Sequence, residues 1–133
     1  MDALATVKLF YSSLASGDGS ATLGLLDPEI EWTEAERTPY FNGTMRGPEA
    51  VVLGLFAPLV RDFDNFTTTP SDFVTEGSKV VSFGQYSGIS KRNGRKMTAP
   101  FVHVWTVFKR PPAAFRSIYR FSTLERGVGL GPV

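Results

Sequence analysis

Cysteine is absent from this sequence, histidine occurs once, and neither sign of charge is in excess. Without cysteine the chain cannot form disulfides, thiolate metal sites or a cysteine nucleophile. A single histidine argues further against a dedicated transition-metal site. The 14 Lys and Arg residues nearly balance the 13 Asp and Glu residues, so no overall field attracts nucleic acid or an anionic membrane. We therefore expect no metal, no nucleic-acid partner and no membrane partner.

Targeting and cofactor signals are missing as well. Residues 1–6 lack the basic and apolar regions of a signal peptide, and no apolar run is long enough to cross a membrane. Gly17-Asp18-Gly19 predicts a turn rather than a phosphate-binding loop. The sequence therefore predicts a soluble, cytoplasmic protein without an organic cofactor.

Aromatic residues, in contrast, are plentiful. They make up 13% of the 133 residues, and Phe alone occurs 11 times. A chain of this length forms one domain with a hydrophobic core, and most of the rings serve that core. Some of them could instead line a cavity for an apolar or ring-shaped ligand.

The segment Glu29-Ile30-Glu31-Trp32-Thr33-Glu34 places a carboxylate beside an indole. Alternate residues of a strand share a face, so Trp32 and Glu34 would line the same surface. An apolar wall beside a carboxylate raises its pKa toward the range of a general base. Glu34 is therefore the candidate base; the equally weighted alternative is a solvated glutamate at the mouth of a loop.

Helical periodicity and turn residues predict helices in the first half of the chain. The first two are expected over residues 2–16 and 19–26, with Asp18 as the cap of the second. A third helix is expected to begin at Pro48, because proline suits a first helical turn. Pro58 is expected to end or bend it.

The second half of the chain predicts strands, with Asn93-Gly94 as a hairpin signal. The strands are expected at 29–34, 63–76, 80–90, 95–109 and 115–124. Helices first and strands later, without βαβ alternation, indicate an α+β fold with helices against one face of a curved antiparallel sheet. We expect a single domain over residues 1–126 and a flexible Gly-rich tail over 127–133.

The predicted strand around residues 99–108 is apolar on both faces. One face carries Phe101, His103, Trp105 and Val107, and the other carries Val102, Val104 and Phe108. The helices can cover only one face of a sheet, so the second face needs another cover. The sequence therefore predicts a homodimer through the sheet face.

Five segments, taken in order, resemble a known family. They are the helix end from Leu14 to Asp18, the leucines before Asp27-Pro28, Ile30-Glu31-Trp32, the stretch from Gly43 to Val51, and the stretch from Ala99 to Trp105. Over residues 4–110 the chain resembles the nuclear transport factor 2-like superfamily, in its SnoaL-like, ketosteroid-isomerase-related branch. The resemblance implies a cystatin-like cone: a curved sheet wrapped around N-terminal helices, an internal apolar pocket, and a dimer through the sheet.

The resemblance also implies positions for the steroid isomerase machinery. The general base falls on Glu34, the oxyanion tyrosine on Phe10, and the second oxyanion acid on Val102. Both hydrogen-bond donors are thus lost, and steroid isomerisation is not expected because a developing enolate would lack stabilisation. Ser122-Thr123 stands where SnoaL-like cyclases carry an acid and a threonine, and the last strand cannot supply the Asp–Arg–Asp set of the family's epoxide hydrolases.

The remaining candidates concern ligand binding. His103 either makes structural hydrogen bonds or titrates near neutral pH as a second catalytic group; if Val102 faces the pocket, alternation turns His103 toward the dimer face. Tyr11, Tyr40 and Tyr86 could each donate a hydrogen bond to a ligand oxygen. The predicted ligand-binding residues are Phe10, Tyr11, Trp32, Tyr40, Leu55, Phe56, Phe83 and Val102.

Three functions remain open on these observations. The first is an enzyme in which Glu34 acts as general acid or base on an apolar or cyclic small molecule, by isomerisation, cyclisation, hydration or dehydration. The second is a non-catalytic binder of an apolar ligand, which a pocket with no second polar group near Glu34 would favour. The third is a protein-interaction module, which a large exposed apolar patch would favour.

Overall fold

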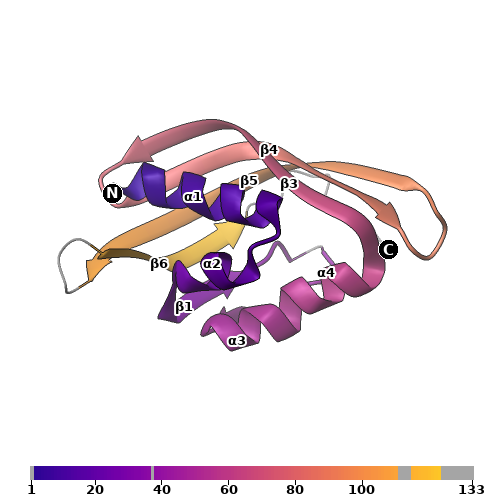
Figure 1. Ribbon diagram of the computed structural model, residues 1–133, viewed down its shortest axis with the longest axis horizontal. Helices are drawn as coiled ribbons and strands as arrows, with labels where there is room; N and C mark the ends of the chain where they lie inside the picture. The colour runs from indigo at the N-terminus through magenta and orange to yellow at the C-terminus, as the bar shows by residue number, and fades with distance from the viewer. Residues whose placement is uncertain (1, 37, 111–114, 124–133) are drawn as a thin grey trace.

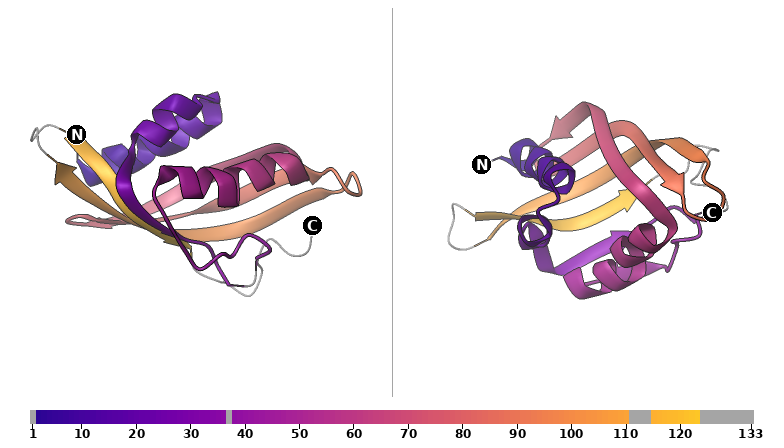
Figure 2. Two further views of the ribbon diagram at one scale, coloured as in Figure 1. Left: turned by 90° about the horizontal axis from the view of Figure 1, so that it is seen from below. Right: turned by 45° about the vertical axis from the view of Figure 1, so that its right-hand side comes forward.

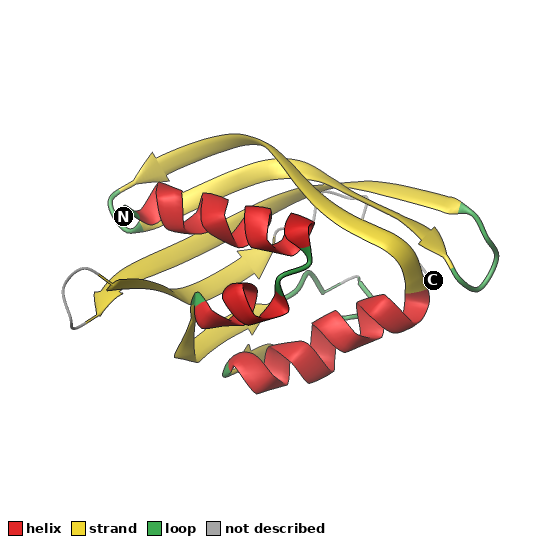
Figure 3. Cartoon of the chain, viewed as in Figure 1, coloured by secondary structure: helices red, strands yellow, loops and turns green. Residues whose placement is uncertain are grey.

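The computed structural model describes residues 2–36, 38–110 and 115–123. The helical elements in these residues are α1 (Ala3–Ser16), α2 (Gly19–Gly24), α3 (Pro48–Val51), the π-helical turn η1 (Val52–Phe56) and α4 (Ala57–Asp62). The strands are β1 (Leu26–Thr33), β2 (Thr44–Arg46), β3 (Phe63–Glu76), β4 (Lys79–Ser90), β5 (Lys96–Arg110) and β6 (Phe115–Thr123). Figure 3 shows the helices gathered on one side of the strands.

The six strands form one curved, unclosed sheet in the order β2-β1-β6-β5-β4-β3. The helices cover its concave face, and the sheet wraps around α1 (Figures 1 and 2). This confirms the predicted α+β cone with N-terminal helices inside the curve of the sheet. The sheet is antiparallel except between β1 and β6, which pair in parallel. The sequence indicated neither this parallel pair nor the short strand β2.

Helix α1 is bounded by two local signals. The Asp2 side chain accepts a hydrogen bond from the Ala5 amide at 2.7 Å, and Gly17 adopts the left-handed conformation, φ 75°, that ends a helix. Val7, Phe10 and Tyr11 form its buried face. The predicted helix over 2–16 is thus confirmed within one residue at its start, and its aromatic side chains are aimed into the cone.

The third helical segment does not end at Pro58. It runs to Asp62, and the π turn η1 ends at Phe56, two residues before the proline. Proline has no N–H for the carbonyl four residues earlier and its ring crowds that carbonyl, and a π turn widens the helix at such a point. The carbonyl four residues before Pro58 is that of Gly54, which cannot accept a helical hydrogen bond from the proline. Asn42 Nδ2 donates to it instead, at 3.3 Å. Pro58 therefore changes the helix locally while α4 continues to the rim of the cone.

Two features of the hairpins shape the sheet. Residues 91–95 connect β4 to β5, so the loop around Asn93-Gly94 is longer than a two-residue turn. Gly84 lies where β3 and β4 cross closely: a Cβ atom there would collide with the Thr69 carbonyl oxygen and the Phe101 ring. Only glycine permits this approach, which lets the sheet curve tightly around the inner side chains.

The inner and outer faces of the sheet differ in their surroundings. Phe101, His103 and Trp105 are buried under the helices, whereas Val74 and Phe108 on the outer face are 60% and 43% exposed. The outer face therefore carries apolar side chains that the helices do not cover. The predicted homodimer through this face stays a prediction, and the predicted tail over 127–133 lies outside the described residues.

Candidate functional site

A small cavity lies between α1, the helical segment 48–62 and the concave face of the sheet. Its volume is about 40 Å³. The apolar lining consists of Phe10, Leu14, Trp32, Leu55, Phe56, Leu59, Phe66, Trp105 and Phe121. Five residues contribute polar groups: Tyr11, Glu34, Thr68, Tyr86 and His103. The cavity is thus an aromatic box with a few polar atoms, the usual composition of a small-molecule site.

A larger hollow, the outer groove, continues from the cavity toward the open end of the cone. It has a volume of about 570 Å³ and is lined by Leu59 and Val60 of α4, by residues 63–69 of β3 and by Lys91, together with residues that also line the cavity. Leu14, Phe56, Leu59, Phe66 and Thr68 line both spaces. A ligand larger than the inner cavity can therefore extend along the groove.

Seven of the predicted site residues meet at the cavity. They are Phe10, Tyr11, Trp32, Glu34, Leu55, Phe56 and His103. These positions come from α1, from β1 and the residue just after it, from η1 and from β5, and the curve of the sheet brings them together. The structure thus places the candidate base and the histidine in one cavity, and their roles stay predictions.

Phe83 and Val102 do not line the cavity, so their predicted placement is wrong. The two residues are cross-strand partners in the β4–β5 ladder. Cross-strand partners share a face, and His103, the next residue after Val102, lines the cavity. A one-residue change in register moves every side chain of a strand to the other face. His103 therefore faces the cavity, against the expectation that it faces the dimer side.

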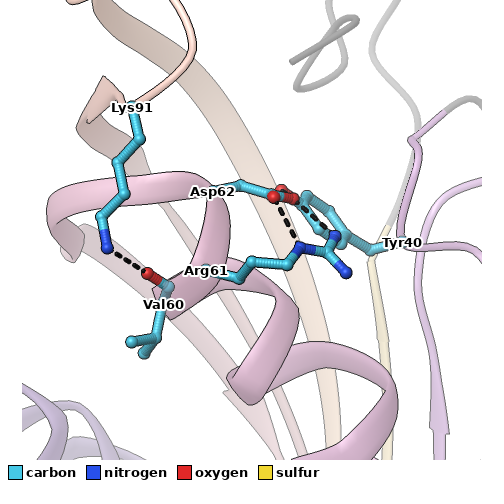
Figure 4. Close-up of polar contacts among 5 residues, drawn as sticks. All are labelled: Tyr40, Val60, Arg61, Asp62 and Lys91. Carbon is cyan, nitrogen blue, oxygen red and sulfur yellow. Dashed lines mark hydrogen bonds and ion pairs between the residues drawn. The ribbon is translucent and has the colours of Figure 1, made fainter.

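Tyr40 is also outside the cavity. Its hydroxyl donates to Asp62 Oδ2 at 2.8 Å, at the end of α4 (Figure 4). Arg61 donates to both carboxylate oxygens of Asp62, at 2.8 and 2.9 Å, and these bonds hold the pKa of Asp62 below its usual range. Lys91 donates to the Val60 carbonyl at 2.9 Å beside this cluster. These contacts tie α4 to the loop before β2 and to the β4–β5 loop, so Tyr40 serves packing at the rim.

Glu34 is the buried carboxyl group of the cavity. It follows β1 directly, is only 5% exposed, and accepts a hydrogen bond at Oε2 from the Trp32 indole Nε1 at 2.7 Å. Burial raises the pKa of Glu34 from 4.5 to about 7, while the indole hydrogen bond opposes the rise. The expected pairing of Trp32 and Glu34 on one surface is confirmed. Burial thus moves the pKa of Glu34 toward the neutral range in which a general acid or base works.

His103 lies at the centre of a hydrogen-bonded row. Its Nδ1 is 2.6 Å from the Tyr11 hydroxyl and its Nε2 is 2.6 Å from the Tyr86 hydroxyl. Tyr11 is in turn 2.5 Å from Ser82 Oγ, to which the Trp105 indole donates at 2.9 Å. Complete burial holds the pKa of His103 well below 6.5, so the ring is neutral.

Tyr86 ends this row at the cavity that Glu34 also lines. Burial raises the pKa of Tyr86 well above 10, with further contributions from the charge of Glu34 and from Tyr11, while a hydrogen bond with Thr123 opposes the rise. Tyr86 therefore keeps its proton and is available as a donor. From the sequence, Tyr86 was one of three tyrosines that could donate a hydrogen bond to a ligand. The sequence did not point to Ser82, which is the cross-strand partner of His103.

The described part of the chain contains no group of three His, Asp or Glu side chains suited to a metal ion. No helix among the described residues is long and apolar enough to cross a membrane.

The polar groups of the cavity are one carboxyl, one neutral imidazole and the hydroxyls of Tyr11, Thr68 and Tyr86. Such a set can transfer a proton and donate hydrogen bonds.

Comparisons with known proteins agree with this architecture. The SnoaL-like domain matches residues 7–110. An NTF2-like protein from Burkholderia thailandensis E264 superposes with a TM-score of 0.84 at 25% identity, covering 98% of this chain and 92% of that one. No curated protein matches the chain.

Two further solved structures share the fold. TerC, co-crystallised with polyporic acid, has a TM-score of 0.76 at 22% identity and covers 94% of this chain and 92% of its own. A candidate SnoaL-like polyketide cyclase from Jannaschia sp. CCS1 has a TM-score of 0.72 at 15% identity, covering 92% of this chain and 83% of its own. The domain match over residues 7–110 and the shared cone show that the chain belongs to the SnoaL-like family of the NTF2-like superfamily.

Proposed function

We propose that this protein binds an apolar, ring-containing small molecule in the cavity and that Glu34 transfers a proton on it as general acid or base. The observation that carries this proposal is the buried Glu34 carboxyl, hydrogen-bonded by Trp32 and with its pKa raised to about 7. Isomerisation, cyclisation, hydration and dehydration all use such a step. The fold alone does not select among them, because one fold hosts many reactions.

The geometry at Glu34 supports a defined role for each oxygen. Oε2 holds the indole hydrogen bond, so we assign the exchangeable proton to Oε1. In the base direction, the carboxylate takes a proton from an activated carbon, and the C–H electron pair moves into the ligand to form an enol or enolate. In the acid direction, the carboxyl group returns that proton to carbon or oxygen. The aromatic walls limit the access of water to the bound ligand.

The second candidate function is a binder without chemistry on the same scaffold. The small inner volume of about 40 Å³ favours it, because only the end of a ligand fits there. Tyr86 and His103 argue against it, since both line the cavity together with Glu34. A binding pocket needs no ionisable carboxyl in an aromatic box, because burying such a group is costly.

A proton-exchange experiment distinguishes the two. The probe is 2-tetralone, a bicyclic ketone with acidic C–H bonds next to its carbonyl, dissolved in D₂O and followed by proton NMR. We expect the protein to accelerate exchange of these protons and the variant Glu34→Gln to abolish the acceleration while still binding the probe. Glu36→Gln, which removes an exposed carboxylate two residues away, serves as the matched control. Equal exchange rates in the wild type and in Glu34→Gln would refute proton transfer by Glu34 and leave the non-catalytic binder as the function.

We further propose that the outer face of the sheet pairs with a second copy of the chain. The support is the apolar row that crosses this face, in which Val74 pairs with Val81 and Val81 with Val104, and which the described helices do not cover (Figure 1). Light scattering at micromolar concentration tests it. A monomeric mass would refute the dimer without affecting the proposal for Glu34.

A further inference from the structure

The row of hydrogen bonds through His103 has a direction that the structure determines. It begins at the Trp105 indole, passes through Ser82, Tyr11 and His103, and ends at the Tyr86 hydroxyl in the cavity. Trp105 Nε1 can only donate, and a neutral imidazole donates from one nitrogen and accepts at the other. Each hydroxyl has one proton to give. The row can therefore run in two ways.

In the first arrangement every proton except that of Tyr86, at the end of the row, has an acceptor within the row. Trp105 donates to Ser82, Ser82 donates to Tyr11, and Tyr11 donates to Nδ1 of His103. The Nε2–H group of His103 then donates to the Tyr86 oxygen. The Tyr86 oxygen is also hydrogen-bonded with Thr123, and the proton of Tyr86 has no acceptor within the row, which leaves it available to an oxygen atom in the cavity that Tyr86 lines.

In the opposite arrangement Tyr86 donates to His103, Nδ1–H donates to Tyr11, and Tyr11 donates to Ser82. Ser82 would then receive two protons, from Tyr11 and Trp105, and its own hydroxyl proton would have no acceptor among the described side chains. Ser82 is fully buried, so water cannot replace the missing acceptor. Buried donors are nearly always paired, and the first arrangement is therefore the one the fold selects.

We infer that Tyr86 donates a hydrogen bond to an acceptor oxygen of the ligand, and that His103, Tyr11 and Ser82 are positioning residues that keep its proton aimed into the cavity. Tyr86 would thereby supply the kind of donor that Phe10 and Val102 cannot. The inference deepens the proposed function, on which it rests for the cavity as the ligand site.

The ligand class follows from this arrangement. Its polar end carries a carbonyl, phenolic or enolate oxygen, because an O–H donor beside a carboxyl of raised pKa favours an acceptor oxygen over a cation. Tyr86 and Glu34 line the same small cavity, so the oxygen at Tyr86 belongs next to the carbon whose proton Glu34 moves. The apolar body of the ligand extends past Leu59 and Phe66 into the outer groove.

Paired probes test the donor at Tyr86. The ketone 2-tetralone carries the acceptor oxygen, and tetralin is the matching hydrocarbon without it. Binding of each is measured by quenching of tryptophan fluorescence, since Trp32 and Trp105 both line the cavity. We expect Tyr86→Phe to weaken binding of 2-tetralone by roughly 3- to 10-fold, the effect of one hydrogen bond, and to leave tetralin unchanged.

Tyr40→Phe is the matched control, because it removes a hydroxyl bonded to Asp62 outside the cavity. It should leave the ratio of the two affinities at the wild-type value. An unchanged ratio in Tyr86→Phe overturns the inference. The two proposals fail separately. If proton exchange depends on Glu34 but Tyr86→Phe leaves the affinity ratio unchanged, the proton-transfer function stands and the hydrogen bond from Tyr86 is refuted. If Tyr86→Phe lowers the ratio but exchange does not depend on Glu34, the hydrogen bond stands and the proton transfer is refuted.

The direction of the row has its own readout in the unmodified protein. His103 is the only histidine in the sequence, so ¹⁵N NMR shows a single imidazole without assignment. We expect the proton on Nε2 and an unprotonated Nδ1, the tautomer that a merely structural histidine need not adopt. A proton on Nδ1 would overturn the direction. In Ser82→Ala the constraint is removed, and we expect a mixture of tautomers together with a smaller preference for 2-tetralone over tetralin.

Discussion

Replacing Glu34 by glutamine should make the protein more stable above neutral pH. The folded state raises the pKa of Glu34 from 4.5 to about 7, chiefly through burial. A group with a raised pKa in the folded state binds its proton more tightly there than in the unfolded chain. The stability of the wild type is therefore complete below the unfolded pKa and declines as the pH rises through the folded one.

The magnitude follows from the size of the pKa shift. A shift from 4.5 to about 7 corresponds to about 3 kcal/mol at 1.36 kcal/mol per unit. Glu34 is only 5% exposed, so solvent screening reduces this figure little. The glutamine side chain of the Glu34→Gln variant keeps an oxygen that accepts the Trp32 indole hydrogen bond, and it cannot ionise. We expect the variant to lack the decline, and the difference in free energy of unfolding between variant and wild type to grow by about 3 kcal/mol from acid to mildly alkaline pH.

Urea denaturation followed by tryptophan fluorescence, from about pH 4 to about pH 8.5, measures this difference. The shape of the pH dependence carries the test, because a constant offset between variant and wild type has no bearing on it. Glu36→Gln controls for the loss of one negative charge at an exposed position. A difference for Glu34→Gln that is flat across the range would refute the buried, proton-binding carboxyl, and with it the basis for its role as a base.

Three further substitutions test the framework around the cavity. Gly84→Ala should cost about 2–3 kcal/mol of stability in thermal or urea unfolding, because its Cβ would collide with the Thr69 backbone and the Phe101 ring; a change near zero would mean that β3 can move away. Tyr11→Phe should cost about 1–3 kcal/mol, since it leaves buried hydrogen-bonding groups without partners, and its effect should vanish if the row does not exist. Asp2→Ala should cost about 1 kcal/mol through loss of the helix cap, and hydrogen exchange should show faster opening confined to the first turn of α1.

The positions of most helices and strands could be predicted because local signals mark them. Asp2 and Gly17 bound α1, and Pro48 begins the third helical segment. The pairing of Trp32 with Glu34 could also be predicted, because residues two apart in a strand share a face. The sequence predicted that Pro58 would end or bend the third helix, but it did not indicate the π turn η1, where Asn42 Nδ2 donates to the Gly54 carbonyl.

The site was only partly predictable because its composition depends on which face of each strand turns inward. The apolar alternation of β5 was clear in the sequence, and it left both faces as candidates for the cavity. Assigning Val102 to the pocket therefore placed His103 on the wrong side. Ser82 and Tyr86 escaped notice as a pair because they join the site only through strand pairing and curvature.

The sequence by itself determined most of the helices and strands, the α+β class, the family resemblance and the aromatic, cysteine-free composition, because these depend on residue type and short-range spacing. Only the tertiary structure decided that the concave face carries His103, that β1 joins the sheet through a parallel pair with β6, and that Tyr86 and Glu34 share a cavity. These are long-range facts: the parallel pair depends on the path of the chain between β1 and β6, and the other two depend on curvature and on register, because a one-residue change of register would move the side chains to the other face.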